Sequence, residues 1–394
     1  MEEILIVSNY YPPETGAAAN RIEQLALKLQ ENNYKVSVIC PLANYPKGKI
    51  FDNYKGKIYH KEILQGITVK RLWIYPSNSK NIFKRIISIL SFVTSLFFYL
   101  LFKKTPKKVV VQSPPLLLSF VTVFALSLRH KKIILNVSDL WPLAAIELKA
   151  VKSGGISHKI SLFMEKYIYK KATLILGQSN EIITHVKSIF PDKKCFLYRN
   201  FPDHKATMNF ENHSENEPIK LFYAGLFGVA QGVFELCKHM DLRNLNIELH
   251  LFGDGAEKNQ IQEYITQYPD NKIFFHGMLD RNSLHERLNA MDIAIVPLKT
   301  RIYGSVPSKI FEYGALGFPI LYCGGGEGED IVNENELGWV VEVGNFVRLN
   351  QALSDISSSG KTNIHQLKEH VITSSNKAFD LNKQIKKLIS EDVF

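Results

Sequence analysis

Short apolar runs alternate with amphipathic helical segments along the whole chain. Near the start, an apolar run at 3–8 is followed by a turn-rich segment. Next come residues 17–31, with apolar positions at helical spacing, and a second apolar run at 34–40. The same succession of strand, glycine-containing loop, helix and strand returns at 219–255. This pattern predicts two similar α/β domains, each with a largely parallel sheet.

Further apolar runs predict the other strands and helices of these two domains. The expected strands cover 107–115, 131–139, 172–179, 271–277, 291–298 and 318–323, and a helix is expected at 283–290. The polar stretch 204–218 has little apolar content and is the expected linker. We expect an N-terminal domain over 1–203, a C-terminal domain over 219–370, and a helical segment over 371–394 that crosses back to the N-terminal domain. The last helix is expected to run unbroken over 377–390.

One stretch, residues 86–102, contains no charged residue and is flanked by two basic pairs, Lys84-Arg85 and Lys103-Lys104. As a helix it would be ~26 Å long, shorter than the ~30 Å hydrocarbon core of a bilayer. A span would also place the next strand across the membrane from earlier strands of the same sheet. We therefore expect no span.

The polar positions of this stretch (Lys84, Ser88, Ser91, Ser95 and Tyr99) form one narrow stripe at helical spacing. The remaining surface is apolar, and the ends are cationic. We expect a helix that lies in the interface of an anionic leaflet through 84–104, with Leu96, Phe97 and Leu100 in the contact. A buried core helix is the alternative.

The charges are unevenly distributed along the chain. The formal net charge is +10, yet the first 200 residues hold 30 Lys and Arg against 12 Asp and Glu, and the remainder is acidic. A basic half favours a polyanionic partner, such as an anionic membrane, a phosphorylated substrate or nucleic acid; a merely solvated basic surface is the alternative. The four cysteines include no C-x-x-C pair, which excludes a disulfide scaffold and is typical of a reducing compartment. The acidic start does not resemble a signal peptide, so we expect an intracellular protein.

The residues with candidate chemistry lie in loops that precede predicted helices. Gly16 precedes the first helix, and Gly225, Gly228 and Gly232 surround the loop at the start of the second half. Glycine lets the backbone approach an anion at a helix N-terminus. Neither loop has the G-x-G-x-x-G spacing of a dinucleotide site, so ordinary turns are the alternative.

The segment 303–319 carries the most specific signal. Pro307 and Ser308 predict a helix start, and Lys309 lies in the first turn, where the helix dipole disfavours a cation. This placement favours a bound anion that the lysine neutralises. Glu312, one turn further, can accept two hydroxyl hydrogen bonds, as from a ribose diol. A solvated Lys–Glu pair is the alternative. Asp139, at the end of a predicted strand, is a candidate to position or deprotonate an acceptor hydroxyl, or simply a turn residue.

Several motifs together resemble glycosyltransferase family 4. They are SNYYPPETGAAANR at the start, QSPPLL at 112–117, SDLWP at 138–142, RNFPD at 199–203, YAGLFGVAQG at 223–232, LFGDG at 251–255 and VPSKIFEYGALGFP at 306–319. The last is similar to the C-terminal part of the family's E-x7-E element. The resemblance is strongest to the O-antigen and capsule branch. It implies the GT-B architecture, with two Rossmann-like domains facing each other across a cleft, and a retaining transfer without a metal or other cofactor.

The resemblance also implies roles for individual residues. It places the ribose contact on Glu312, whereas the first glutamate of E-x7-E falls on Gly304, so backbone N–H groups at 305–308 would bind the sugar instead. The family's cationic phosphate ligands fall on Leu226 and Gln231, which leaves the diphosphate to Lys309, Arg301 and helix N-termini. With the catalytic candidates Asp139 and Lys309, the expected donor-binding set is Gly16, Gly225, Gln231, Gly253, Arg301, Ser305, Val306, Ser308, Lys309 and Glu312, and the expected acceptor-side set is Arg21, Ser138 and Asn200. No D-x-D motif or His-rich ligand set is present, and no metal site is expected.

These observations favour a nucleotide-sugar-dependent glycosyltransferase, peripheral on the cytoplasmic face of the plasma membrane. Its expected donor is a UDP-sugar, such as an N-acetylated amino or deoxyamino sugar. Its expected acceptor is a polyprenyl-diphosphate-linked glycan of surface polysaccharide synthesis. Two alternatives remain: a catalytically degenerate scaffold that binds a sugar nucleotide, and a basic nucleic-acid-binding protein. No nucleic-acid partner is expected, because the bases surround an apolar helix and match no recognisable binding motif.

Overall fold

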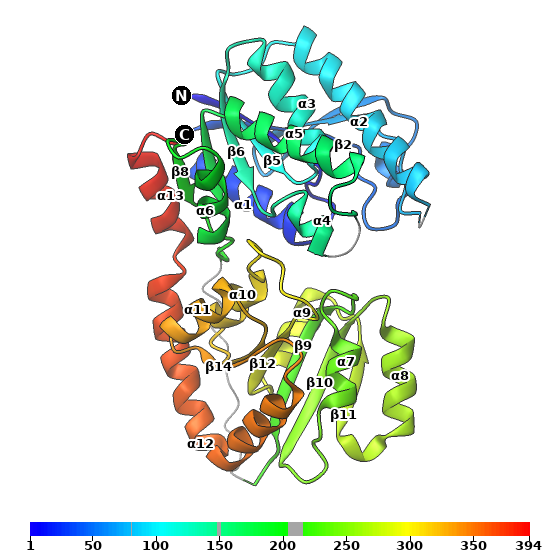
Figure 1. Cartoon of the computed structure of the whole chain (residues 1–394), viewed down its shortest axis with the longest axis vertical. Helices are drawn as coiled ribbons and strands as arrows, with labels where there is room; N and C mark the ends of the chain where they lie inside the picture. Colours follow the sequence, from blue (N-terminus) through cyan, green and yellow to red (C-terminus); the bar gives the residue numbers. More distant parts are fainter. Residues whose placement is uncertain (80, 148–150, 204–215) are drawn as a thin grey trace. The chain divides into compact units, whose positions relative to one another are not determined.

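The computed structural model describes residues 1–394 except 80, 148–150 and 204–215 (Figure 1). It divides into two compact units. The N-terminal unit contains Met1–Asn200 together with Tyr303–Ser305 and Asn382–Phe394. The C-terminal unit contains Phe201–Ile302 and Val306–Leu381. Most of the predicted linker, 204–215, lies outside the described residues.

The N-terminal unit is built on an eight-stranded sheet in the order β3-β4-β2-β1-β5-β6-β7-β8. All neighbouring strands are parallel except the β3–β4 hairpin. This hairpin was not predicted from the sequence. The strands are β1 (Glu3–Val7), β2 (Lys35–Pro41), β3 (Tyr59–Leu64), β4 (Ile67–Leu72), β5 (Lys108–Ser113), β6 (Lys132–Val137), β7 (Leu174–Gly177) and β8 (Cys195–Leu197).

Helices cover this sheet and pack with it around one apolar core. Within the core, α3 packs against both α2 and α5, and all three contact strands of the sheet. The helices are α1 (Ala17–Glu31), α2 (Ile82–Phe102), α3 (Leu116–Ser127), α4 (Leu143–Glu147), α5 (Ile156–Lys171), α6 (Asn180–Ile189) and α13 (Leu381–Ser390), with a 3-10 turn at Asp52–Tyr54.

The predicted apolar helix is α2, and its polar stripe faces the protein. The hydroxyl of Ser91 accepts a hydrogen bond from the Tyr75 N–H (2.8 Å). Among the residues that the structure describes, 83–102 form the one helix long and apolar enough to cross a membrane by length and composition. The expectation that Leu96 and Leu100 contact a membrane is wrong, because both side chains are fully buried in the core.

The last thirteen residues complete the N-terminal unit. The side-chain amide of Gln384 accepts from the Arg199 N–H (2.9 Å) and donates to the Arg199 carbonyl (3.0 Å). Lys132 donates to the Asp392 carbonyl (2.9 Å), and the Tyr34 hydroxyl donates to the carbonyl of the buried Phe394 (3.2 Å). Residues 382–394 thus pack on the N-terminal unit and stabilise it through these hydrogen bonds.

The C-terminal unit has a six-stranded sheet in the order β11-β10-β9-β12-β13-β14, with all neighbours parallel. The strand order reverses direction between β9 and β12, which makes their carboxyl ends the topological switch point of the sheet. The strands are β9 (Ile219–Leu226), β10 (Ile247–Asp254), β11 (Ile273–Gly277), β12 (Ile293–Pro297), β13 (Ile320–Cys323) and β14 (Gly338–Val341).

The final helical segment is broken at Gly360 and at Phe379, and the second of these breaks divides the helix that the sequence predicted over 377–390. Gly360 has a φ of 75°, so α12 is two helices joined at a kink. A second break separates α12 from α13 at Phe379, whose ring packs on Phe201 and Phe311 (centroids 5.5 and 5.1 Å apart). The helices of this unit are α7 (Val233–His239), α8 (Lys258–Gln267), α9 (Arg281–Leu288), α10 (Ser308–Ala315), α11 (Glu327–Glu334) and α12 (Phe346–Ala378), with a 3-10 turn at Pro269–Asn271.

Candidate functional site

Lys309 lies in the first turn of α10, as predicted. No side chain caps this helix, so no capping side chain satisfies the backbone N–H groups of its first turn. The Lys309 side chain is 27% exposed, and its Nζ lies 4.0 Å from an oxygen of Glu312. The same Nζ lies 5.0 Å from the ring centre of Tyr313 and 5.8 Å from that of Tyr223. Lys309 is therefore held between two aromatic rings and is not a freely solvated side chain.

Both phenols are fixed to the end of β9. The Tyr313 hydroxyl donates to the Ala224 carbonyl (2.9 Å) and accepts from the Ala224 N–H (3.2 Å). The Tyr223 hydroxyl donates to the Leu226 carbonyl (2.7 Å). A Cβ on Gly225 would lie 2.8 Å from Cε of Lys309, so glycine leaves the space that the lysine stem fills.

The surroundings keep Lys309 charged. Burial alone would lower its pKa, but Tyr313, Glu312 and Tyr223 outweigh this effect and raise the pKa above its usual value. Glu312 is more open, with 56% of its side chain exposed. A cation and a solvent-accessible carboxylate one helical turn apart can bind an anion and a diol side by side.

This pair lies at the topological switch point, where open α/β sheets bind ligands. The β9 loop that contains Gln231 and the loop after β12 are joined there by a hydrogen bond from the Lys299 N–H to the Ala230 carbonyl (3.0 Å). Gly253 has a packing role, since a Cβ at this position would overlap the carbonyl oxygen of Gly225.

The other predicted donor residues occupy different environments. Arg301 is exposed, and its guanidinium passes so close to Gly326, the residue before α11, that a Cβ there would lie 2.5 Å from Nε. Val306 is buried. Ser308, the first residue of α10, is half-buried.

A second polar cluster lies within the N-terminal unit. Asp139 lies near the end of β6, is half-buried and accepts a hydrogen bond from the side chain of Ser305. Burial raises the pKa of Asp139, while the Arg21 guanidinium and the Ser305 hydroxyl partly oppose this shift. Arg21 donates a hydrogen bond to the side chain of Gln178, and its Nε has no partner among the described residues. The predicted Asp139, Arg21 and Ser305 thus lie together.

The other predicted residues of the N-terminal unit differ in accessibility. Ser138 is buried, and its hydroxyl accepts a hydrogen bond from the Gln112 amide (2.6 Å). Asn200 is half-buried. Gly16 is exposed at the start of α1, which has no capping side chain. Contacts of these residues with a substrate stay predictions.

The segment Tyr303–Ser305 is anchored within the N-terminal unit through its backbone. The Tyr303 N–H donates to Glu147 (2.9 Å), the Gly304 N–H donates to Glu181 (2.6 Å), and the Gly304 carbonyl accepts from the Ser179 hydroxyl (2.8 Å). Gly304 has a φ of 85°, and a Cβ there would lie 3.0 Å from Leu140. The conformation at 304 therefore suits glycine and would strain a glutamate.

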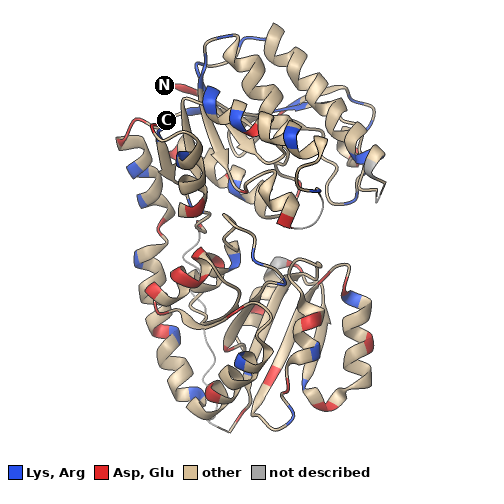
Figure 2. Ribbon diagram, viewed as in Figure 1, with Lys and Arg blue, Asp and Glu red and all other residues tan. Residues whose placement is uncertain are grey.

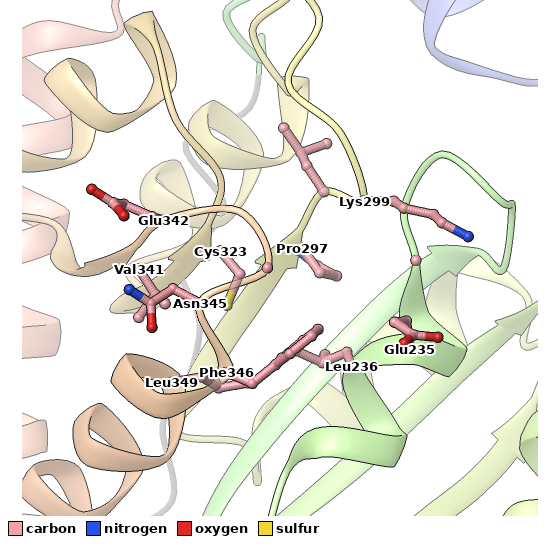
Figure 3. A pocket seen from close by; sticks show the side chains of 13 residues that line it. Glu235, Leu236, Pro297, Lys299, Cys323, Val341, Glu342, Asn345, Phe346 and Leu349 are labelled. Atoms are coloured by element: carbon pink, nitrogen blue, oxygen red, sulfur yellow. The ribbon is translucent and has the colours of Figure 1, made fainter. Parts of the chain in front are cut away.

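A pocket in the C-terminal unit is lined by the candidate loop residue Gly232 but by no residue of the expected donor-binding or acceptor-side sets (Figure 3). It has an empty volume of about 430 Å³, part of it open to solvent, and lies at the carboxyl ends of β12, β13 and β14. Its floor is apolar, and its charged lining residues are Glu235, Glu342 and Lys299. Two carboxylates against one ammonium disfavour a diphosphate, so we do not assign the donor to this pocket.

Sequence reasoning missed several residues that shape these sites. Tyr223 and Tyr313 resemble ordinary core aromatics in the sequence. Glu14, buried before Gly16, accepts from the N–H groups of Asn44 and Tyr45 (2.8 and 2.9 Å) and so fixes the loop before α1. No linear pattern signals these long-range contacts. Across the described part of the chain, no group of three or more His, Cys, Asp or Glu residues is arranged to hold a metal ion.

Comparisons with known proteins bear on the family and the fold of the chain. Residues 204–391 match the sequence model of the family described as Glycosyl transferases group 1. No curated protein matches the chain by sequence. A sucrose-phosphate synthase from Thermosynechococcus elongatus has a similar structure, with a TM-score of 0.76 at 15% identity over 99% of both chains.

Two further solved structures are similar over the same extent. HepE of Anabaena, in complex with UDP-glucose, gives a TM-score of 0.68 at 13% identity, covering 99% of this chain and 100% of its own. A variant of S. aureus TarM, in complex with fondaparinux, α-GlcNAc-glycerol and UDP, gives 0.69 at 10% identity over 99% of both chains. The chain has the two-domain α/β fold of the GT-B glycosyltransferases, as the resemblance implied. The family match covers residues 204–391, and the likeness in fold covers nearly the whole chain.

Proposed function

We propose that the protein is a retaining glycosyltransferase that moves a sugar from a nucleotide-sugar donor to a polyprenyl-diphosphate-linked glycan in surface polysaccharide synthesis. The proposed donor is a UDP-sugar, such as an N-acetylated amino or deoxyamino sugar. The observation that carries the proposal is the Lys309 ammonium, held by two phenols beside the open Glu312 carboxylate at the switch point of the sheet. The family match and the UDP-containing complexes of similar structures support it.

On this proposal, Lys309 and Glu312 bind adjacent parts of the leaving nucleotide: Lys309 binds its diphosphate and Glu312 its ribose. The bond between the anomeric carbon and the diphosphate oxygen breaks, and negative charge grows on that oxygen. A cation already in position stabilises this charge without further reorganisation. Glu312 accepts hydrogen bonds from the ribose diol and so fixes the nucleotide. Arg301 and the uncapped start of α10 add positive potential.

Asp139 is the proposed partner of the acceptor hydroxyl in the N-terminal unit. As a carboxylate, Asp139 accepts the proton of the acceptor hydroxyl or orients that hydroxyl. The oxygen of the acceptor hydroxyl forms the new bond to the anomeric carbon. The charge of Arg21 favours the ionised form of Asp139, and burial opposes it. The proposal requires neither a metal nor another cofactor, and it places the enzyme on the cytoplasmic face of the plasma membrane, in contact through 84–104.

A second candidate is a scaffold that binds a sugar nucleotide without turnover. The observation that favours it is Gly304, whose conformation would strain the glutamate that the family resemblance implies at this position. Incubation of the full chain with a panel of nucleotide-sugars and a lipid-linked acceptor separates the two. Transfer of radiolabelled sugar, unaffected by EDTA, supports the enzyme. Donor binding by calorimetry without transfer from any donor supports the scaffold, and neither binding nor transfer contradicts both.

A further inference from the structure

The outward side of α2 is mostly apolar, with an exposed hydroxyl at Thr94 and exposed bases at Lys84 and Arg85 in its first turn. Phe83, Leu90 and Phe98 are 72%, 46% and 52% exposed, while the serine stripe faces the protein. An isolated exposed apolar side chain needs no explanation, but several large ones on the same side of one helix do.

The apolar surface continues from α2 across α3 and α5, which pack side by side with it (Figure 1). A chain of ring contacts links the three helices. The distances between ring centroids are 6.3 Å for Phe97 of α2 and Phe124 of α3, and 6.3 Å for Phe124 and Tyr167 of α5. Phe120 of α3 and Phe163 of α5 have centroids 6.1 Å apart. We define the three-helix face by its exposed apolar side chains: Phe83, Ile86, Ile87, Leu90, Phe98, Phe102, Phe124, Leu128, Ile156, Ile160 and Phe163.

The three-helix face has basic neighbours and no exposed carboxylate. Neither α2 nor α3 contains an acidic residue, and the one acid of α5, Glu165, is buried against His185 (2.9 Å). Exposed bases lie at the ends of α2 and along α5 (Figure 2). They are Lys84, Arg85, Lys103, Lys104, Lys159, Lys166, Lys170 and Lys171. An apolar surface bordered by cations is complementary to a bilayer with anionic headgroups.

We propose that the three-helix face is a bilayer-docking surface, on which α2, α3 and α5 together rest on an anionic leaflet. The inference rests on the proposed function, because a lipid-linked acceptor places the enzyme at a membrane. It adds α3 and α5 to the contact and excludes a span. The other side of α2, with Phe92, Leu96 and Leu100, is buried in the core. A span is excluded because β4 and β5, which precede and follow α2 in the sequence, belong to one sheet.

A second copy of the chain is a poorer occupant of the same face. A symmetric dimer would bring two acid-free, cation-bordered surfaces together, and like charges would repel. The size of the face also fits a functional surface. At 1.5 Å per residue, α2 (21 residues), α3 (12 residues) and α5 (16 residues) are ~32, ~18 and ~24 Å long. Spaced ~8–10 Å apart, they cover roughly 500 Å², which is the size of the largest apolar patch on a typical monomer, and such patches are often functional.

The test is flotation of the full chain with vesicles of phosphatidylcholine, with or without phosphatidylglycerol. Two double variants probe separate helices: Leu90→Ser with Phe98→Ser on α2, and Ile160→Ser with Phe163→Ser on α5. All four positions are exposed, so the variants should fold, as thermal melts will verify. The matched control is Phe274→Ser with Val347→Ser, exposed apolar residues of the C-terminal unit.

We expect the wild-type chain to float with the anionic vesicles and each double variant to bind them at least tenfold more weakly, since burying one large apolar side chain is worth ~1.5–3 kcal/mol. The control should bind like the wild type. Lys159→Gln with Lys166→Gln should weaken binding to anionic vesicles severalfold and leave the weaker binding to neutral vesicles unchanged.

Two results would overturn the inference. One is unchanged binding of the α5 double variant, which would restrict the contact to α2. The other is a lipid-free dimer in light scattering that Ile160→Ser with Phe163→Ser converts to monomer, which would identify a second copy as the occupant. A failed transfer assay with normal vesicle binding would count against the proposed function but not against the docking surface.

Discussion

Replacing Lys309 with methionine is the most direct test of the donor site. Methionine keeps an unbranched side chain of similar length, so the space over Gly225 stays filled while the ammonium is lost. Tyr223 and Tyr313 keep their hydrogen bonds to β9, because neither of these bonds involves Lys309. The substitution therefore removes a charge and leaves the surrounding structure in place.

The expected effect on binding follows from the position of the ammonium. It is partly desolvated, with 27% of the side chain exposed, so its interaction with a phosphate is only partly screened by water. A charge-assisted hydrogen bond of this kind contributes ~1.5–3 kcal/mol, which corresponds to a loss of roughly 10- to 150-fold in affinity. In the transition state the leaving oxygen carries more charge, and loss of one preorganised donor lowers kcat by about 10²–10³-fold.

The binding loss is measured by calorimetric titration with UDP as the probe, and the kinetic loss by single-turnover transfer with saturating donor. Lys299→Met is the matched control, because this exposed lysine lies in the same unit and outside the Lys309 cluster. The reasoning is refuted if Lys309→Met binds UDP as tightly as the wild type, or if Lys299→Met loses as much.

Three other perturbations give independent results. Glu312→Ala should weaken nucleotide binding at least tenfold in the same titration, because ~1.5–3 kcal/mol attaches to hydrogen bonds with a charged acceptor; unchanged affinity contradicts the ribose contact. Asp139→Asn should abolish transfer with little change in UDP binding. Because burial raises the pKa of Asp139 and the carboxylate is the active form, wild-type activity should fall as the pH drops towards that raised value; an acidic limb that persists in the variant would contradict this role. Gly304→Ala should lower the free energy of unfolding by about 1–3 kcal/mol in a denaturant melt. Gly154→Ala, with a similar φ of 77° but open space around its Cβ position, should cost less because it lacks the clash.

Elements determined by local pattern were predictable from the sequence, and those determined by distant partners were not. The apolar runs predicted strands in both sheets, because buried parallel strands need continuous apolar residues. The β3–β4 hairpin was missed because its outer strand alternates exposed and half-buried positions. The final helix was wrongly joined because its break depends on the packing of Phe379 on Phe201 and Phe311, which lie far away in sequence.

The candidate sites divide in the same way. Lys309 and Glu312 were predictable as neighbours, since residues three apart share one face of a helix. The contribution of Tyr313 and Tyr223 was not, because it depends on hydrogen bonds between α10 and β9. The direction of the serine stripe of α2 was likewise undetermined, because periodicity identifies two faces without saying which one meets the core.

The composition of the N-terminal unit has a consequence for its biogenesis. Ribosomal synthesis supplies residues 1–200 early, but the partners of Arg199, Lys132 and Tyr34 are contributed by 382–394, which are synthesised only after the C-terminal unit. The N-terminal unit can therefore form all of its contacts only after residues 382–394 have been synthesised. Splitting the gene between the two halves would produce an incomplete fragment, and co-expression of 382–394 as a separate peptide would be needed to restore its missing contacts.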